Sequence, residues 1–411
     1  MQEAITTQCC IAGGGPAGIM LGYLLARAGV DVVVLEKWPD FFRDFRGDTI
    51  HPSTMELLKE LGLIDRFLKL PHNEMTRMTI RVGGEEATVA DLSHLHAACP
   101  FIAFIPQWDF LTFIAHEGKA YPQFKVLMST EATDLIREGE RVTGIRAKNA
   151  DGPFDIRADL VIGADGRHST LREKAGAPVT DLSVPIDVLW FRIARTDQDD
   201  QQSLGYLVPG HALVMLDRRE YWQCAYIIEK GGIDAIKAKG LEAFRESIST
   251  LARLPRESVA EVDSWDKVKL LSVTVDHVSE WSQEGLLLIG DAAHAMSPLG
   301  GVGINYAIQD AVAAANILAP YFGSGPVPRE ALRRVQARRQ KPVLKMQRLQ
   351  VFIQNHVLAP VLSGKAGSRM PLVLRFFAWL PILRRIPARV IGIGFGPEHI
   401  DPSIIDGQMK R

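Results

Sequence analysis

The sequence QCCIAGGGPAGIMLGYLLARAGVDVVVLE, residues 8–36, decides the expected fold class. Residues 8–11 indicate a buried strand, residues 19–28 have the apolar spacing of a helix, and residues 31–36 indicate a second strand. The glycine turn between the first strand and the helix follows the pattern GxGxxG at Gly13, Gly15 and Gly18. This βαβ unit predicts a Rossmann-like α/β domain.

The glycine turn predicts a dinucleotide site, because bare amides and the positive end of the helix can meet a pyrophosphate there. Glu36 ends the second strand, where a carboxylate can bond both hydroxyls of an adenosine ribose. The alternative is that the glycines only permit close packing and that Glu36 is a solvated strand end. The turn residues expected at the dinucleotide are Gly13, Gly15, Pro16, Ala17 and Gly18.

The rest of the chain alternates between helical and strand patterns. Residues 54–61 and 108–115 predict helices, and residues 79–90 predict a hairpin at Gly83 and Gly84. Residues 125–162 predict an antiparallel meander, so we expect the parallel winding to stop there. Residues 188–194, 212–216 and 221–228, with a helix at 241–251, predict an inserted sheet, and the patterns at 286–289 and 305–318 predict a return to the first domain.

Two later motifs carry more specific information. Residues 159–169 read DLVIGADGRHS and contain Asp165-Gly166, and residues 290–294 read GDAAH and contain Asp291. With the N-terminal turn and in this order, these motifs resemble those of the class A flavoprotein monooxygenases, the para-hydroxybenzoate hydroxylase family. The resemblance extends from about residue 9 to residue 314, and between residues 180 and 275 only the alternating β character matches.

The resemblance implies FAD as the dinucleotide. It places Asp291 near a ribityl hydroxyl and the amides of residues 298–305 near the pyrimidine edge of the flavin, where the helix dipole would stabilise the anionic reduced form. Simpler alternatives are a capping role for Asp291 and an ordinary loop before a helix. Val302 departs from the glutamine that many relatives carry. The further residues implied at the cofactor are Arg46, Gln107, Asp165, Pro298, Gly301, Gly303, Ile304 and Asn305, of which Arg46 and Gln107 could instead be surface residues.

The expected architecture is therefore α/β: a Rossmann-like FAD-binding domain with an inserted β-sheet substrate domain and a helical C-terminal segment. We assign residues 1–70, 100–178 and 272–325 to the FAD-binding domain. Residues 71–99 and 179–271 form the substrate domain, and residues 326–411 form the C-terminal segment.

The activity that the resemblance implies is aromatic hydroxylation. NAD(P)H binds transiently and reduces FAD, O2 adds at the flavin C4a carbon, and the hydroperoxide passes oxygen to an electron-rich ring, so the cofactor performs the chemistry and no catalytic side chain is assigned. An FAD-dependent reductase or dehydrogenase that acts on a hydrophobic substrate without oxygen insertion is the alternative. Chlorination is disfavoured because the Trp-x-Trp-x-Ile-Pro signature is absent.

Three residues of the inserted sheet are candidates for the substrate pocket. Arg192 can bind a carboxylate or phenolate, and Gln223 or Tyr226 can orient a hydroxyl. Alternatively, the arginine lies along the sheet surface and the aromatic residue fills the core. The two histidines beside the cofactor motifs, His51 and His294, are potential proton carriers, although we expect His294 to be a structural hydrogen-bond partner.

Composition limits the partners and the location. The chain has 47 basic and 48 acidic residues, which gives a net charge of −1 and no indication of a nucleic-acid partner. Four cysteines without CxxC spacing predict no metal site and favour the cytoplasm, and neither a signal peptide nor a transmembrane span is expected. The expected partner is a small aromatic or quinone-like substrate.

The basic stretch from Arg333 to Arg348 predicts a half-solvated amphipathic helix. The alternative is peripheral contact with an anionic membrane, with the apolar residues that follow dipping inward. Those residues are Phe376, Phe377, Trp379 and Leu380. Substrate identity, hydroxylation position, the choice between NADH and NADPH, and oligomeric state have no signal in the sequence.

Overall fold

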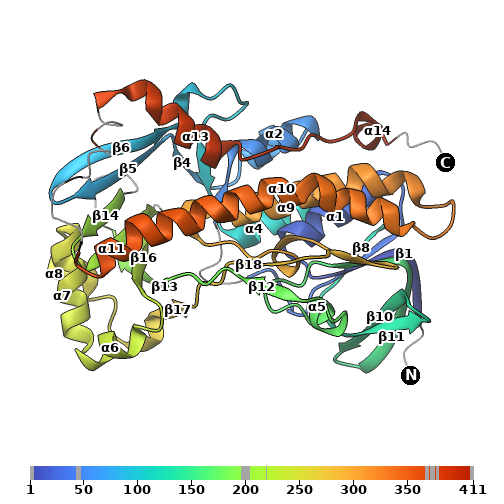
Figure 1. The fold of residues 1–411 in the computed structure, drawn as a ribbon. Helices are drawn as coiled ribbons and strands as arrows, with labels where there is room; N and C mark the ends of the chain where they lie inside the picture. Colours follow the sequence, from blue (N-terminus) through green and yellow to red (C-terminus); the bar gives the residue numbers. More distant parts are fainter. Residues whose placement is uncertain are drawn as a thin grey trace.

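Two large β-sheets and a long helix that crosses in front of them organise the chain (Figure 1). The structure is a computed structural model that describes residues 4–42, 48–195, 204–218, 220–365, 370, 375 and 379–407. In this part of the chain no helix is long and apolar enough to cross a membrane. All four cysteines are buried and free.

The first sheet has eight strands in the order β19-β20-β11-β1-β2-β8, and the hairpin β9-β10 extends it from β11. Strands β2 and β11 are both parallel to β1, β8 is parallel to β2, and β20 is parallel to β11. The bounds are β1 (Ile5–Ala12), β2 (Val32–Leu35), β8 (Phe124–Leu127), β9 (Glu131–Glu138), β10 (Arg141–Asn149), β11 (Gly152–Gly163), β19 (Ser282–Gln283) and β20 (Leu286–Leu288).

The prediction that parallel winding stops at residue 125 was wrong. The segment does contain an antiparallel meander, but β8 before it is parallel to β2. Strand β11 is twelve residues long, and its first half pairs with β10 while its second half pairs with β1. One strand therefore takes part in both antiparallel and parallel pairing, and the alternation of apolar and polar residues along it does not distinguish the two.

Helices α1 (Pro16–Arg27), α2 (Pro52–Glu60), α4 (Gln107–Gly118) and α9 (Gly303–Leu318) belong to this domain. Helix α1 is buried from Ala17 to Ala26 because it packs against the sheet, α4 and α9. Leu24 and Leu25 are fully buried, and each contributes roughly 1.5–3 kcal/mol through burial. This packing fixes the start of α1, where the glycine turn lies.

The second sheet has seven strands in the order β17-β13-β16-β15-β14-β5-β6. The predicted hairpin at residues 79–90 is β5-β6, and β5 joins this sheet parallel to β14. Helix α7 covers the face that carries Phe191 and Tyr226, while Val188 and Ala225 belong to a separate cluster on the other face. The bounds are β5 (Arg77–Val82), β6 (Glu85–Asp91), β13 (Ile186–Ala194), β14 (Leu204–Val208), β15 (His211–Asp217), β16 (Tyr221–Glu229), β17 (Lys269–Leu271), α6 (Ile233–Ala238), α7 (Leu241–Ala252) and α8 (Arg256–Val259).

Short elements connect the two sheets. A three-stranded sheet pairs β7 with β3 and β4, and Asn73 of β4 donates its side-chain amide to the carbonyl of Asp217, 2.9 Å away, at the end of β15. The bounds are α3 (Ile64–Phe67), β3 (Thr49–Ile50), β4 (Asn73–Met75), β7 (Ile102–Phe104), α5 (Thr170–Lys174), β12 (Val179–Asp181) and β18 (Asp276–Val278).

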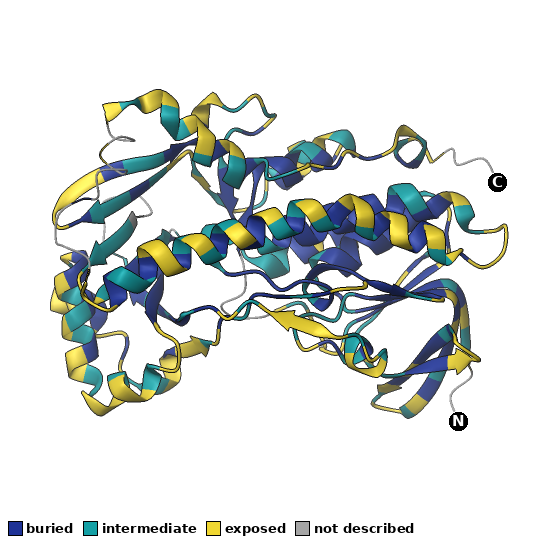
Figure 2. Ribbon diagram, in the orientation of Figure 1, coloured by how far each residue is buried: buried dark blue, intermediate teal, exposed yellow. Residues whose placement is uncertain are grey.

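Helix α10 (Arg329–Ile353) packs on α9, and α11 (Ala359–Leu362) reaches β15 and β16. Figure 2 shows a buried underside and an exposed outer face along α10, which confirms the predicted amphipathic helix. Arg339 is the exception to the solvated basic face, because it is buried against Asp310. The remaining elements of the described residues are η1 (Leu92–His94), η2 (Trp265–Lys267), η3 (Gly290–Ala292), η4 (Leu299–Gly301), η5 (Ala319–Tyr321), η6 (Gln354–Leu358), η7 (Pro381–Arg384), α13 (Arg385–Gly392) and α14 (Pro402–Ile405).

Candidate functional site

Four parallel strands end at the same edge of the first sheet. In the register of this sheet, Ala12 lies opposite Leu35 and Gly163, and Gly163 lies opposite Leu288. The glycine turn, Glu36, the Asp165-Gly166 motif and the Gly290-Asp291 motif each follow one of these strands. The carboxyl ends of the strands therefore bring together motifs as far apart in the chain as Gly13 and Asp291, 278 positions (291 minus 13), at the edge where open α/β sheets bind ligands.

The glycines of the first turn have different roles. A Cβ on Gly18 would lie 1.9 Å from the Gly13 carbonyl oxygen, and one on Gly13, at φ +106°, would lie 2.2 Å from that of Ala164, so both positions require close packing. In the part of the chain that the structure describes, Gly15, the N-cap of α1, has open space within 4 Å and no side-chain cap. The start of α1 therefore has room for an anion.

Glu36 lies directly beside this turn. Its Oε2 accepts a hydrogen bond from the Gly14 amide (3.2 Å), and its Oε1 accepts one from the Trp38 amide (3.0 Å). These bonds hold the carboxylate next to the open helix end, as a ribose partner requires.

The Gly290-Asp291 motif is held from behind by Asp310 of α9. The carboxylate of Asp310 accepts bonds from the Gly290 amide (3.1 Å) and Arg339 Nε (3.0 Å) and lies 2.6 Å from His294 Nε2. Burial opposes ionisation of Asp310, but His294 and Arg339 outweigh it and lower the pKa. His294 is thus a structural hydrogen-bond partner, as predicted.

Asp291 itself is on the outer side of this turn. Its side chain is 32% exposed, and its Oδ2 lies 3.5 Å from Arg167 Nη2 of the Asp-Gly motif. Arg172 connects the two motifs further, since its Nη1 donates to the carbonyls of Asp291 (3.4 Å) and Ala292 (3.3 Å). Asp291 is therefore placed where it can meet a ligand, and Arg172 is a positioning residue that the sequence did not indicate.

Asp165 faces inward. Its carboxylate accepts bonds from the Ser169 hydroxyl and the Leu171 amide at the start of α5, and burial raises its pKa. The structure thus gives Asp165 a capping role beside the site. Arg46, another residue implied at the cofactor, lies outside the described residues.

The start of α9 forms a second open helix end. Gly301, at φ +64°, approaches Thr49 so closely that a Cβ would lie 2.4 Å from its hydroxyl, while Gly303 has open space. Asn305 uses its side chain to hold this loop: its Oδ1 accepts bonds from the His51 amide (2.9 Å) and the Thr54 hydroxyl (2.8 Å). Pro298 is half-buried and Ile304 is buried at the two ends of the loop.

A buried ion pair lies between the two sheets. Arg218 Nη2, at the end of β15, is 2.6 Å from Asp48 Oδ2, and the two side chains are 5% and 7% exposed. Asp48 also accepts a bond from the Gln107 amide (3.3 Å), and Arg218 Nε donates to Gln223 Oε1 (3.0 Å). Burial raises the pKa of Asp48 despite Arg218. Within the described residues, Arg218 Nη1 is buried without a hydrogen-bond partner.

Neither Asp48 nor Arg218 was predicted from the sequence. Asp48 stands two residues after Arg46, which the family resemblance implies at the cofactor, so this neighbourhood in the sequence was a signal that could have found it. Arg218 follows a strand and is flanked by other charged residues, and no local pattern distinguishes it from a solvated turn.

Two of the three predicted pocket residues share one face of the second sheet. Arg192 and Gln223 are opposite each other in the β13-β16 register, and the Arg192 guanidinium lies 4.6 Å from the Tyr221 ring centre. Tyr226, three residues beyond Gln223, belongs to the opposite face, where it packs against Phe244 at 5.3 Å. The structure therefore does not bring Tyr226 to the other two, because side chains alternate along a strand.

The residues present fit a dinucleotide. Two helices, α1 and α9, begin at this edge, and among the described residues neither has a side-chain cap and each has a glycine facing open space. Uncapped helix ends offer amides and a positive dipole to phosphate or another anionic group.

Comparison with known proteins agrees with this geometry. A family model described as "FAD binding domain" matches residues 6–347. The chain belongs to the class A flavoprotein monooxygenases. As a member of this family, it is an FAD-dependent monooxygenase with an FAD-binding domain and a substrate domain.

The proteins to which this flavoprotein monooxygenase is similar include others that are named monooxygenases. It is 30% identical over 385 residues to 6-methylpretetramide 4-monooxygenase of Streptomyces rimosus, covering 92% of each chain. It is 28% identical over 322 residues to rifampicin monooxygenase of Streptomyces venezuelae, covering 73% of this chain and 61% of that longer protein. The structure of p-nitrophenol 4-monooxygenase from Pseudomonas putida has the same fold, with a TM-score of 0.74, 19% identity and 99% of both chains covered.

Proposed function

We propose that this monooxygenase hydroxylates an aromatic substrate that carries an acidic hydroxyl, with NAD(P)H as reductant and O2 as the oxygen source. The observation that carries the proposal is the buried cluster of Asp48, Arg218 and Gln223 between the cofactor edge and the second sheet. It offers a cation, a carboxylate and an amide in a site shielded from water.

The cofactor end of the site would be held by residues of the first sheet. The turn from Gly13 to Gly18 and the start of α1 would bind the pyrophosphate, Glu36 the adenosine ribose, Asp291 the ribityl chain, and the start of α9 the flavin ring. When bound, FAD would supply the redox chemistry, from hydride uptake to oxygen transfer, by the route that the family resemblance implies.

The substrate end would be organised by Arg218. Its buried Nη1 is a donor without a protein acceptor among the described residues, and an oxygen of the substrate would satisfy it. A guanidinium favours a phenolate over a neutral hydroxyl, and the low dielectric of a buried site strengthens this preference. Arg192 and Gln223 extend the polar surface along β13 and β16.

Asp48 would act as the proton acceptor for the substrate hydroxyl. Burial raises the pKa of Asp48, which makes the carboxylate a stronger base toward a phenol of pKa about 10. Deprotonation increases the electron density of the ring, and an electrophilic oxygen needs an electron-rich ring. The proton would thus move from the substrate oxygen to the carboxylate while Arg218 holds the phenolate.

The domain assignment supports the same proposal. We propose that residues 71–99 and 179–271 form the substrate domain, since β5 and β6 extend the sheet built by β13 to β17. The named relatives are monooxygenases, which favours oxygen insertion over the reductase alternative.

Oxygen insertion is tested by supplying NADH or NADPH and a set of phenols under heavy-oxygen gas. We expect one labelled oxygen atom in the product and perturbation of the flavin spectrum by the phenols that react. Reduced product without label would refute hydroxylation and support the reductase.

The substrate end is tested with a matched pair of variants. Gln223→Leu should raise KM for the phenol about tenfold, because one hydrogen bond to the site is lost. Tyr226→Phe, on the opposite face of the same strand, should leave KM within about twofold. Equal effects of both variants would contradict the assignment of the pocket to the face of Gln223.

A further inference from the structure

The charge of this chain is strongly segregated. Residues 331–397 contain thirteen lysines and arginines and no aspartate or glutamate, whereas the remaining residues contain 34 basic and 48 acidic side chains. The thirteen are Arg333, Arg334, Arg338, Arg339, Lys341, Lys345, Arg348, Lys365, Arg369, Arg375, Arg384, Arg385 and Arg389. The near-neutral net charge is therefore the sum of a basic C-terminal region and an acidic remainder.

This basic region also displays an apolar stripe. Trp379, Ile382 and Ile386 are 76%, 63% and 63% exposed. Ile382 and Ile386 are four residues apart in the continuous helical stretch of η7 and α13, which places them on one face. Trp379 stands just before this stretch, separated from it by the non-helical Leu380. Exposed large apolar side chains on a soluble protein are normally scattered singly. Three within eight residues indicate an interaction surface, which we call the C-terminal stripe.

The orientation of the stripe is fixed by the opposite side of α13. Ala388 and Gly392 are buried, and a Cβ on Gly392 would lie 2.8 Å from the Leu95 side chain. Arg385 and Arg389 are exposed on the same short helix. In Figure 2 the outer side of α13 is exposed at the top of the molecule. The helix therefore turns Ala388, Ile391 and Gly392 toward the domain, and Ile386 and its exposed arginines outward.

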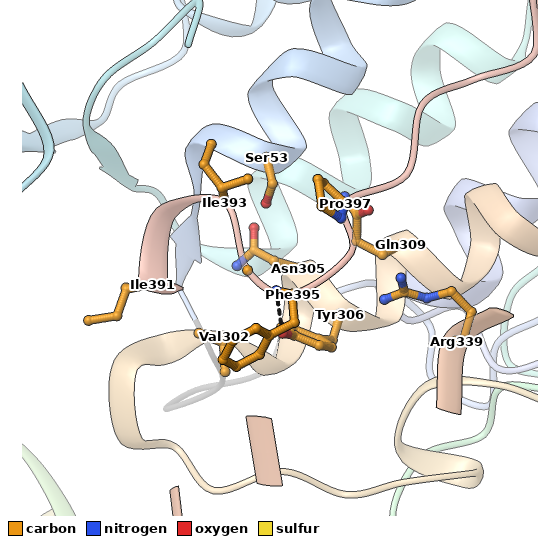
Figure 3. Close-up of a pocket in the computed structure, with 11 residues that line it drawn as sticks. Ser53, Val302, Asn305, Tyr306, Gln309, Arg339, Ile391, Ile393, Phe395 and Pro397 are labelled. Carbon is orange, nitrogen blue, oxygen red and sulfur yellow. Dashed lines mark hydrogen bonds between the residues drawn. The ribbon is translucent and has the colours of Figure 1, made fainter. Parts of the chain in front are cut away.

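The segment that follows α13 is firmly attached to the FAD-binding domain. The Phe395 amide donates to the Tyr306 hydroxyl (3.1 Å), as Figure 3 shows, and Arg339 Nη1 of α10 donates to the Gly396 carbonyl (2.9 Å). Arg338 forms an ion pair with Glu398 at 2.7 Å. The cavity between this segment and α9 has a volume of about 10 Å³, which is room for about one water. The stripe is thus displayed by a packed element.

We propose that the C-terminal stripe, together with the exposed Arg385 and Arg389 beside it, docks this enzyme on an anionic lipid bilayer. Apolar side chains and a tryptophan flanked by arginines suit the interface of a membrane, where the side chains insert singly and the arginines meet lipid phosphates. A standard protein interface needs about 20–30 residues a side, far more than the stripe offers. The basic charge is complementary to an anionic leaflet.

The proposal is tested with the FAD-loaded enzyme and vesicles. We expect co-sedimentation with phosphatidylcholine vesicles that contain about 30% phosphatidylglycerol, little with phosphatidylcholine alone, and weaker binding in about 0.5 M salt. Substitution of Trp379, Ile382 and Ile386 by serine should lower the partition coefficient about tenfold or more.

A matched control replaces two exposed apolar residues elsewhere. Val179 and Leu270 are each 45% exposed, and Val179→Ser with Leu270→Ser should leave vesicle binding unchanged. Flavin content reports whether each variant is folded, and if the triple variant loses flavin, the single change Ile386→Ser, expected to weaken binding severalfold, decides. Absence of wild-type binding to anionic vesicles, or an equal loss in the control, would overturn the proposal. So would dimerisation through the stripe, seen by sedimentation velocity, without lipid binding.

Discussion

Replacing Arg218 by methionine should destabilise the protein in a pH-dependent way. The change removes the cation of a buried pair whose side chains are 5% and 7% exposed and whose charged atoms are 2.6 Å apart. Asp48 then remains as a buried carboxylate, and the loss of one partner of such a pair costs roughly 3–5 kcal/mol. Methionine retains most of the packing volume, so the cost reports the charge more than a cavity.

The pH dependence follows from the direction of the Asp48 pKa. Burial raises this pKa in the folded state above its ordinary value of 3.8, so in the window above 3.8 the folded protein binds a proton more tightly than the unfolded chain, and stability falls as pH rises. Arg218 is the strongest influence that lowers this pKa. Removal of Arg218 raises the Asp48 pKa further and so extends this pH window upward. The loss of unfolding free energy in Arg218→Met should therefore be larger at about pH 8 than at about pH 5.

Urea denaturation at both pH values, followed by circular dichroism, measures this effect. The double variant Asp48→Asn with Arg218→Met should recover most of the loss, since no buried charge remains. Arg157→Met removes an ion pair to Glu138 whose side chains are 44% and 69% exposed, and it should cost less than about 1 kcal/mol. A deficit of Arg218→Met below about 1 kcal/mol, or one independent of pH, would refute the reasoning.

Three further predictions concern the cofactor edge. Gly15→Ala should fold with a loss of about 1 kcal/mol and release FAD more readily, because its Cβ occupies the open space at the start of α1. Gly18→Ala should fail to fold normally, because its Cβ meets a backbone oxygen at 1.9 Å. Flavin titration together with thermal unfolding distinguishes the two variants. Burial lowers the pKa of His51 to about 4, so the stability that the neutral imidazole contributes is complete above about pH 6.5 and is lost as pH falls toward 4. The unfolding free energy of His51→Gln should therefore decline less steeply than that of the wild type as the pH is lowered. Asp310→Asn should cost roughly 3 kcal/mol, because buried Arg339 keeps only Glu398, at 3.4 Å, as a charge partner. It should also weaken FAD binding by releasing the Gly290 turn, and unchanged flavin affinity would argue against that positioning role.

Much of the candidate cofactor site could be predicted from local patterns. The glycine turn and Glu36 lie within 29 residues, and each feature has a short-range cause: a strand, a tight turn and a helix end. The residues of the substrate pocket were harder to predict, because the candidates were single residues on strands whose side chains point alternately to the two faces of the sheet. Tyr226 was grouped with Gln223, although a separation of three residues places them on opposite faces of β16.

The sequence by itself determined the α/β class, the dinucleotide turn and the motifs that indicate FAD, because these depend on residues close together in the chain. Only the tertiary structure showed that β8 and β11 continue the parallel sheet, that Asp48 meets Arg218, and that Asp310 supports the Gly290 turn. These partners are separated by 20 to 170 residues. Which of them meet depends on how sheets and helices pack, and that is a property of the whole chain rather than of any local pattern.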